Sequence, residues 1–67
     1  MTAPEYVAIR TRLDLNTEDL AAVLGVTRRT VQIHEATGSI PEPVARLMRL
    51  IDWEPELIGD LKAIGAD

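Results

Sequence analysis

The 67-residue sequence contains no cysteine, which excludes a disulfide framework and a metal site built on thiolates. Its single histidine leaves too few ligands of the usual kinds for a zinc site. No apolar run approaches the roughly 20 residues that a membrane-spanning helix needs, and the N-terminal residues lack a signal-peptide pattern. We therefore expect a cytoplasmic protein with no metal, no cofactor and no membrane partner.

The groups that carry catalysis are also missing. No serine or lysine lies beside a base, and there is no glycine-rich phosphate-binding loop. A chain of this length forms a single small domain, here residues 1–67, and leaves no room for a ligand-sensing domain. We expect a protein that is not an enzyme and binds no small-molecule ligand.

Charge is distributed unevenly along the chain. The formal net charge is −4, whereas a basic surface is typical of nucleic-acid-binding proteins. Residues 1–51 hold six arginines and six acids, while residues 52–67 hold five acids and one lysine. The acidic segment either points away from a phosphate surface bound by the neutral part or is simply a solvated helix face.

Helix-start and helix-stop signals predict five helices and no strand, so the expected fold class is all-α. The first helix covers about residues 3–13 and has Thr2 as its N-cap, in a capping box. The second begins at Asn16 or Thr17, which are alternative caps. Gly25 ends it, because a left-handed C-cap is favourable only without a Cβ atom.

The remaining three helices follow from apolar spacing and proline positions. The third covers about residues 28–36, and Pro41 and Pro43 frame the start of the fourth. A break at residues 53–55 precedes a fifth helix over about residues 55–64. The domain core is then about residues 3–52, with a separate C-terminal helix. The expected inner stripe of the fourth helix is Val44, Leu47, Met48, Leu50 and Ile51.

The segment of residues 16–35 predicts two short helices joined by a tight turn at Gly25. The second of these helices opens with Arg28 and Arg29 and carries Gln32 one turn later. Such a helix presents base-reading side chains to a DNA groove. The segment is therefore predicted to be a helix-turn-helix.

Over about residues 5–51 the chain resembles the Cro and phage-repressor (XRE-like) family of helix-turn-helix proteins. This resemblance implies a five-helix phage-repressor-like DNA-binding domain with the helix-turn-helix in its second and third helices. Two features depart from the family pattern: His34 takes a position that is usually aromatic or aliphatic, and residues 38–42 lack positive charge. The resemblance is carried by Arg10, Leu13, Leu15, residues 20–32, Glu35, Ile40, Pro41 and residues 44–47.

The expected base-reading residues are Arg28, Arg29, Gln32 and Ile33. Arginine is the best bidentate donor to guanine O6 and N7, and glutamine can pair with adenine N6 and N7. Ile33 either touches a thymine methyl group or packs as a partly buried residue. For the arginines and the glutamine, the alternative is an exposed polar surface without a ligand.

Short polar side chains near helix starts are the expected phosphate contacts. Asn16 and Thr17 open the second helix, while Thr27 and Thr30 lie at the start of the third. Ser39 is the candidate on the far side of the third helix. Thr27 is first a helix cap, so that phosphate contact would be an additional role.

The resemblance also implies a structural ion pair between Arg10 and Glu35, which would hold the third helix against the first. A well-buried pair would cost about 3–5 kcal/mol to break. A surface pair would be worth less than about 1 kcal/mol. His34 is expected to fill the usual aromatic position at the edge of the core.

An apolar stripe in the fifth helix predicts a homodimer contact. Leu57, Leu61 and Ile64 recur at helical spacing, with Ile58 beside them. Part of this stripe should be exposed in a monomer, since the other helices can close a core without it. The alternative is that the fifth helix completes the core of its own subunit. Trp53 lies either in the dimer contact or between the fourth and fifth helices.

The resemblance implies a sequence-specific transcriptional regulator that binds a palindromic operator in double-stranded DNA as a homodimer. Family members of this size commonly repress their own operon in phages and mobile elements, some beside toxin or anti-CRISPR genes. The alternative function is a protein-interaction module, or an antitoxin-like partner, built on the same fold. The acidic segment and the loop without positive charge favour this alternative.

Overall fold

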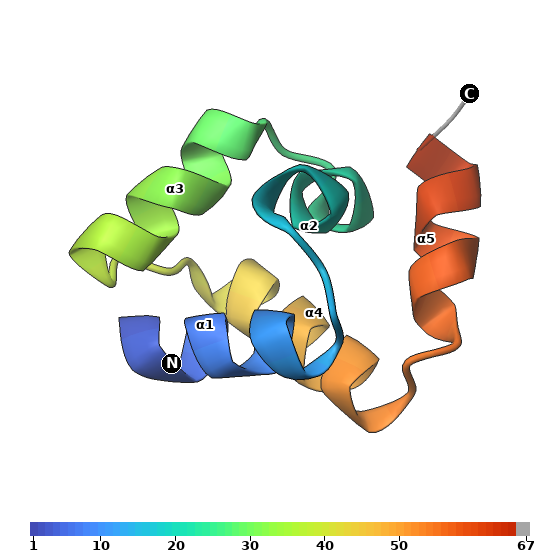
Figure 1. Cartoon of the computed structure of the whole chain (residues 1–67), viewed down its shortest axis with the longest axis horizontal. Coiled ribbons are helices and arrows are strands. Elements are labelled where there is room, and N and C mark those ends of the chain that lie inside the picture. Colours follow the sequence, from blue (N-terminus) through green and yellow to red (C-terminus); the bar gives the residue numbers. More distant parts are fainter. Residues whose placement is uncertain (66–67) are drawn as a thin grey trace.

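The computed structural model describes residues 1–65, in which five α-helices and no strand are present. In Figure 1, α2 is seen nearly along its axis at the centre, with α3, α1, α4 and α5 arranged around it. The prediction of an all-α fold is confirmed. The helices are α1 (Ala3–Arg12), α2 (Thr17–Leu24), α3 (Arg28–Thr37), α4 (Glu42–Trp53) and α5 (Leu57–Gly65).

Local capping defines the first three helices. Thr2, Asn16 and Thr27 each accept a hydrogen bond from the backbone N–H three residues later, at 3.3, 2.7 and 3.2 Å. Of the two alternatives at α2, Asn16 is therefore the cap and Thr17 the first helical residue. Gly25 ends α2 in the left-handed conformation, with φ 74°. These contacts satisfy backbone groups that have no partner within the helix.

The core is formed where α1, α2, α3 and α4 meet. Side chains buried there are removed from water, which contributes about 1.5–3 kcal/mol for each large apolar residue. Tyr6 carries its hydroxyl into this core, so that it requires a hydrogen-bonding partner there. The largest fully buried side chains are Tyr6, Leu20, Val31, Met48 and Ile51.

The inner face of α4 differs from the predicted stripe. Ala45, Met48 and Ile51 are buried at a spacing of three residues, whereas Leu50 remains 41% exposed. The prediction was wrong at Leu50. The face of α4 that contacts the core is narrower than the stripe formed by its apolar residues, and Leu50 lies outside this face. Trp53 is the last residue of α4 and is 81% exposed. It therefore does not seal α4 against α5.

The fifth helix begins at Leu57, two residues later than predicted. Pro55 and its neighbour form a turn, in which the backbone N–H of Leu57 donates to the carbonyl of Glu54 at 3.1 Å. The helix packs against α2, with Ile58 and Leu61 against the core. Part of the predicted stripe is thus used within the subunit.

Two glycines allow the backbone of this fold to be tested with a matched pair of variants. Gly25 has a positive φ, whereas Gly59 lies within α5, and an added Cβ would meet no atom within 4 Å at either position. We expect Gly25→Ala to lower the free energy of unfolding by about 1 kcal/mol through backbone strain alone. Gly59→Ala should raise it by about 0.5 kcal/mol, because helical glycine is entropically costly. Urea denaturation measures both, and effects of the same sign would contradict this backbone.

Candidate nucleic-acid interface

The third helix is anchored to the rest of the domain by one face. Val31 is fully buried and His34 is 5% exposed, and the helix packs against both α1 and α2. In Figure 1, α3 lies at the edge of the molecule, so that its other face is open. A helix held in this way can present its open face to a ligand while the fold keeps it in place.

The open face carries all four side chains that the sequence predicts to read bases. Arg28, Arg29 and Gln32 are exposed, and Ile33 is 47% exposed. The structure therefore brings these four residues together over the first two turns of one helix. Since Ile33 is not covered by the core, its side chain is available for an apolar contact.

The arginines of this face differ from most other cations of the domain in lacking carboxylate partners. Among residues 1–65, neither Arg28 nor Arg29 forms an ion pair, and Arg49 on α4 is the third such arginine. The positive end of the α3 dipole lies at the same place. The start of α3 therefore attracts anions. The pairs that neutralise the other cations are Arg10–Glu35, Arg12–Asp52, Arg46–Glu42 and Lys62–Asp19.

The predicted phosphate-binding residues do not form one cluster. Asn16 and Thr17 are at the start of α2, while Thr27 and Thr30 are at the start of α3, where their hydroxyls lie 3.0 Å apart. Ser39 follows the far end of α3, and its backbone N–H donates to the Thr37 hydroxyl at 3.2 Å. Thr27, Thr30 and Ser39 thus flank α3 at its two ends, while Asn16 and Thr17 belong to α2.

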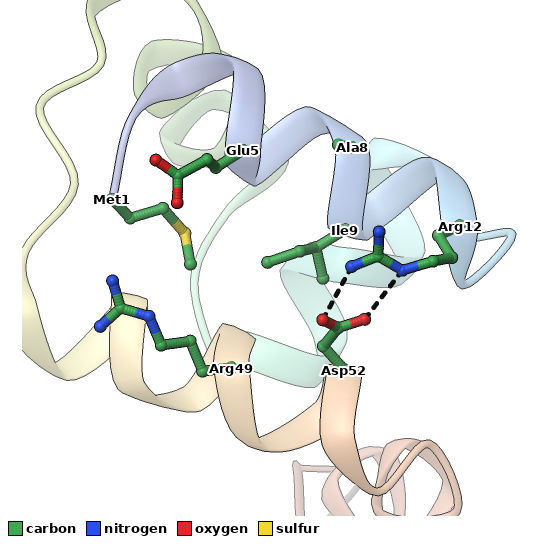
Figure 2. Close-up of a pocket in the computed structure, with 7 residues that line it drawn as sticks. All are labelled: Met1, Glu5, Ala8, Ile9, Arg12, Arg49 and Asp52. Atoms are coloured by element: carbon green, nitrogen blue, oxygen red, sulfur yellow. Dashed lines mark hydrogen bonds and ion pairs between the residues drawn. The ribbon is translucent and has the colours of Figure 1, made fainter.

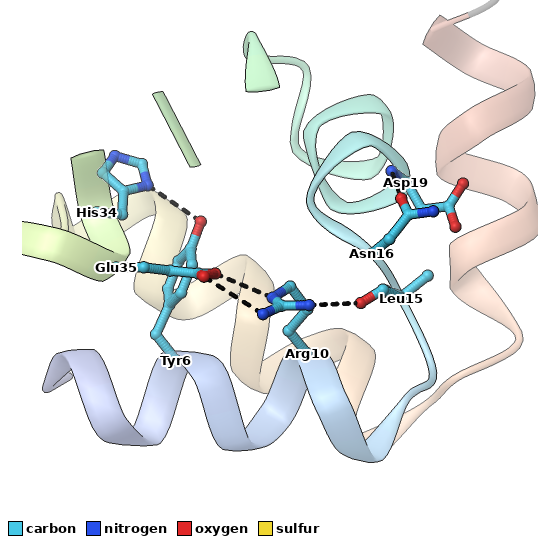
Figure 3. A network of polar contacts seen from close by, with 7 residues as sticks. All are labelled: Tyr6, Arg10, Leu15, Asn16, Asp19, His34 and Glu35. Atoms are coloured by element: carbon cyan, nitrogen blue, oxygen red, sulfur yellow. Dashed lines mark hydrogen bonds and ion pairs between the residues drawn. The ribbon is translucent and has the colours of Figure 1, made fainter. Parts of the chain in front are cut away.

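Arg10 connects three parts of the chain (Figure 3). Its Nε donates to Oε2 of Glu35 at 2.9 Å and its Nη2 to Oε1 of the same residue at 3.3 Å. Its Nη1 donates to the backbone carbonyl of Leu15 at 3.0 Å. The pair is largely buried, with side-chain exposures of 20% and 18%. Arg10 therefore holds α3 and the segment before α2 against α1.

A second polar contact between α1 and α3 lies beside the first. The Tyr6 hydroxyl and Nδ1 of His34 share a hydrogen bond of 3.1 Å, and their rings meet edge to face (Figure 3). Burial raises the pKa of Tyr6 to about 12; the carboxylate of Glu35 also raises it, while Arg10 lowers it. His34 can be buried between α1 and α3 because the Tyr6 hydroxyl provides its polar partner.

Sequence reasoning missed the contact between α1 and α4 made by Arg12 and Asp52. The guanidinium donates from Nε at 3.0 Å and from Nη2 at 2.7 Å to the two carboxylate oxygens. The two residues lie 40 positions apart, and no local pattern connects them. A long-range pair of this kind becomes visible only once α1 and α4 are packed.

Comparison of the chain with protein-family models, with curated proteins and with solved structures found no match. The fold defines the protein as a small all-helical domain of five helices. Within residues 1–65, no helix has the length and apolar character needed to cross a membrane. In the same part of the chain, no group of three histidine or acidic side chains is placed to hold a metal ion.

We expect Arg10→Met to lower the free energy of unfolding by about 2–3 kcal/mol, because it leaves the largely buried carboxylate of Glu35 without its partner. The matched control is Arg12→Met. It breaks an equally well-formed pair whose side chains are 58% and 31% exposed, and it should cost less than about 1 kcal/mol. Urea denaturation at neutral pH measures both. Equal losses would show that burial does not distinguish the two pairs.

We expect stability to fall as the pH rises from about 10 towards 12. The folded chain keeps Tyr6 protonated up to about pH 12, whereas the unfolded chain releases this proton near its ordinary pKa of 10.0. Stability is therefore fully present below pH 10, and up to about 2–3 kcal/mol is lost as the pH approaches 12. Because the chain has one tyrosine, phenolate absorbance follows this residue alone.

The control for the alkaline titration is Tyr6→Phe, which removes the titrating hydroxyl and keeps the ring. This variant should be less stable at neutral pH, since Nδ1 of His34 loses its buried partner. Its stability should change less between pH 10 and 12 than that of the natural chain. A phenolate midpoint near pH 10 while the chain is still folded would contradict the burial of Tyr6.

Proposed function

We propose that this protein is a sequence-specific DNA-binding transcriptional regulator. In this proposal α2 and α3 form a helix-turn-helix, and α3 enters the major groove of double-stranded DNA. The observation that carries the proposal is the open face of α3, on which Arg28 and Arg29 are exposed and have no ion-pair partner among residues 1–65.

Sequence would be read by the four exposed residues of this face. Arg28 and Arg29 would donate to O6 and N7 of guanines, and Gln32 one turn later would pair with adenine. Ile33, with 47% of its surface exposed, would contact a thymine methyl group. The half-site would then contain guanines contacted by the start of α3, followed by A·T pairs along the helix.

Neutral groups would supply many of the phosphate contacts. The starts of α2 and α3 offer backbone N–H groups together with Asn16, Thr17, Thr27 and Thr30, and helix N-termini favour phosphate. Asp19 at the start of α2 opposes this attraction, but Lys62 pairs with it at 3.4 Å. Ser39 would make the contact beyond the far end of α3.

One recognition helix reads only a few base pairs, so selectivity requires two copies on a palindromic operator. We therefore propose that the protein acts as a homodimer. By its resemblance to phage repressors, it would repress its own operon in a phage or mobile element. The second candidate function, a protein-interaction module, is favoured by the acids of the C-terminal segment and by the net charge of −4.

We expect Arg28→Ala and Arg29→Ala to weaken binding to the operator, because each removes base or phosphate contacts worth about 1–3 kcal/mol. The probe is duplex DNA from immediately upstream of the coding sequence, compared with a shuffled duplex of equal composition. Fluorescence anisotropy at fixed salt gives both affinities, and a selection from random duplexes provides a second probe if the upstream DNA is not preferred.

The control variant is Arg46→Ala, which removes an exposed arginine of α4 that is paired with Glu42. It should leave both DNA affinity and the helical circular dichroism spectrum unchanged. Affinity that is equal for natural and shuffled duplexes, with no sequence enriched by selection, would overturn the proposal. That result would favour the protein-interaction module.

A further inference from the structure

The α4 helix leaves a large aromatic side chain in water. Trp53 is 81% exposed at the end of this helix, and Leu50, one turn earlier, is 41% exposed. Tryptophan is the residue most enriched among those that dominate the energy of protein interfaces, where it fills a pocket on the partner. An exposed tryptophan beside an exposed leucine therefore indicates a contact surface.

A groove that could receive such a side chain lies between α1 and α4 (Figure 2). Its volume is about 300 Å³, at the lower limit of the roughly 300–1,000 Å³ typical of ligand pockets. Ile9, which is only 7% exposed, lies at its base, and the Arg12–Asp52 pair closes one end. The lining residues are Met1, Glu5, Ala8, Ile9, Arg12, Arg49 and Asp52.

We propose that Trp53 of one copy of the chain occupies the α1–α4 groove of a second copy. Trp53 lies one helical turn beyond Arg49, which lines the groove, so α4 contributes to both parts of the contact. A two-fold axis beside α4, with the two α4 helices antiparallel, places each Trp53 over the partner's groove. The contact is then self-complementary, as a two-fold interface requires.

Charge favours the same arrangement. Arg49 lines the groove and Glu54 directly follows Trp53, and neither forms an ion pair among residues 1–65. In the antiparallel arrangement, Glu54 of one copy lies near Arg49 of the other, twice in each dimer. Arg49 can also lie against the partner's indole ring, as cations do at aromatic faces.

The apolar stripe of α5 is less suited to this role. Ile58 and Leu61 already pack against the core of their own subunit. Ile64 is 72% exposed, but it lies near the far end of α5, away from the junction with α4. The Trp53 side chain and the α1–α4 groove would thus form the dimer contact of the proposed regulator. That the protein forms a dimer at all is an expectation that rests on the proposed function.

Sedimentation and tryptophan fluorescence of the full chain without DNA test this interface. Because the chain has one tryptophan, its emission reports Trp53 alone. We expect the emission to shift to shorter wavelength as concentration rises, with the same midpoint as dimer formation by sedimentation. Emission of a water-exposed indole from a monomer at high micromolar concentration would overturn the inference.

Point variants distinguish the Trp53 surface from the exposed face of α5 as the dimer contact. Trp53→Ala should raise the dimer Kd about thirtyfold or more, whereas Ile64→Ala, which truncates another exposed apolar residue, should leave it unchanged. Arg49→Glu should weaken the dimer and the double variant Arg49→Glu/Glu54→Arg should restore it, because like charges become opposite again in both contacts. Circular dichroism verifies that each variant is folded.

A dimer weakened by Ile64→Ala but not by Trp53→Ala would overturn the inference in favour of α5. A monomer whose operator binding still depends on Arg28 would overturn the inference while leaving the proposed function in place. A Trp53-dependent dimer that prefers no DNA sequence would support this interface and overturn the proposed function.

Discussion

The placement of α3 depends on the polar contacts that α1 makes with it. Arg10 holds Glu35 through two hydrogen bonds and at the same time holds the backbone carbonyl of Leu15. Beside it, the buried hydroxyl of Tyr6 meets His34. A buried polar group without a partner costs about 1–3 kcal/mol, so these contacts favour one orientation of α3. In that orientation Arg28, Arg29 and Gln32 remain exposed near the start of α3.

The distribution of charge then follows from which cations find partners. On α1 and α5, Arg10, Arg12 and Lys62 each lie against a carboxylate of another element. Such pairs stabilise packing between helices. Because the two charges compensate each other, they leave little electrostatic field outside the protein. At the start of α3, Arg28 and Arg29 add to the positive end of the helix dipole without such compensation. An acidic chain can therefore still present a local positive surface to DNA, which is the basis of the proposed function.

The small size of the domain explains why apolar side chains of α4 and α5 are incompletely buried. A chain of about 60 residues buries only about 60% of the surface that it exposes when unfolded. The α5 helix adds to the core through Ile58 and Leu61, but no residue of this helix is fully buried. Trp53 and Leu50 stay in contact with water on the neighbouring helix. If a second copy buried these two side chains, the total buried apolar area would exceed what the core of one small domain provides.

The sequence by itself determined the number of helices and the ends that carry strong capping signals, because capping and helix-breaking act over only three or four residues. It left the cap of α2 open and placed the start of α5 two residues too early. Thr2, Thr27 and Gly25 define helix ends in this local way, and the exposed face of α3 follows from helical periodicity. The tertiary structure alone decided the burial of Ala45 rather than Leu50, the pairing of Arg12 with Asp52 across 40 residues, and the packing of α5 on α2. These depend on which helix faces meet, and that choice minimises exposed apolar area over the whole chain rather than within any segment.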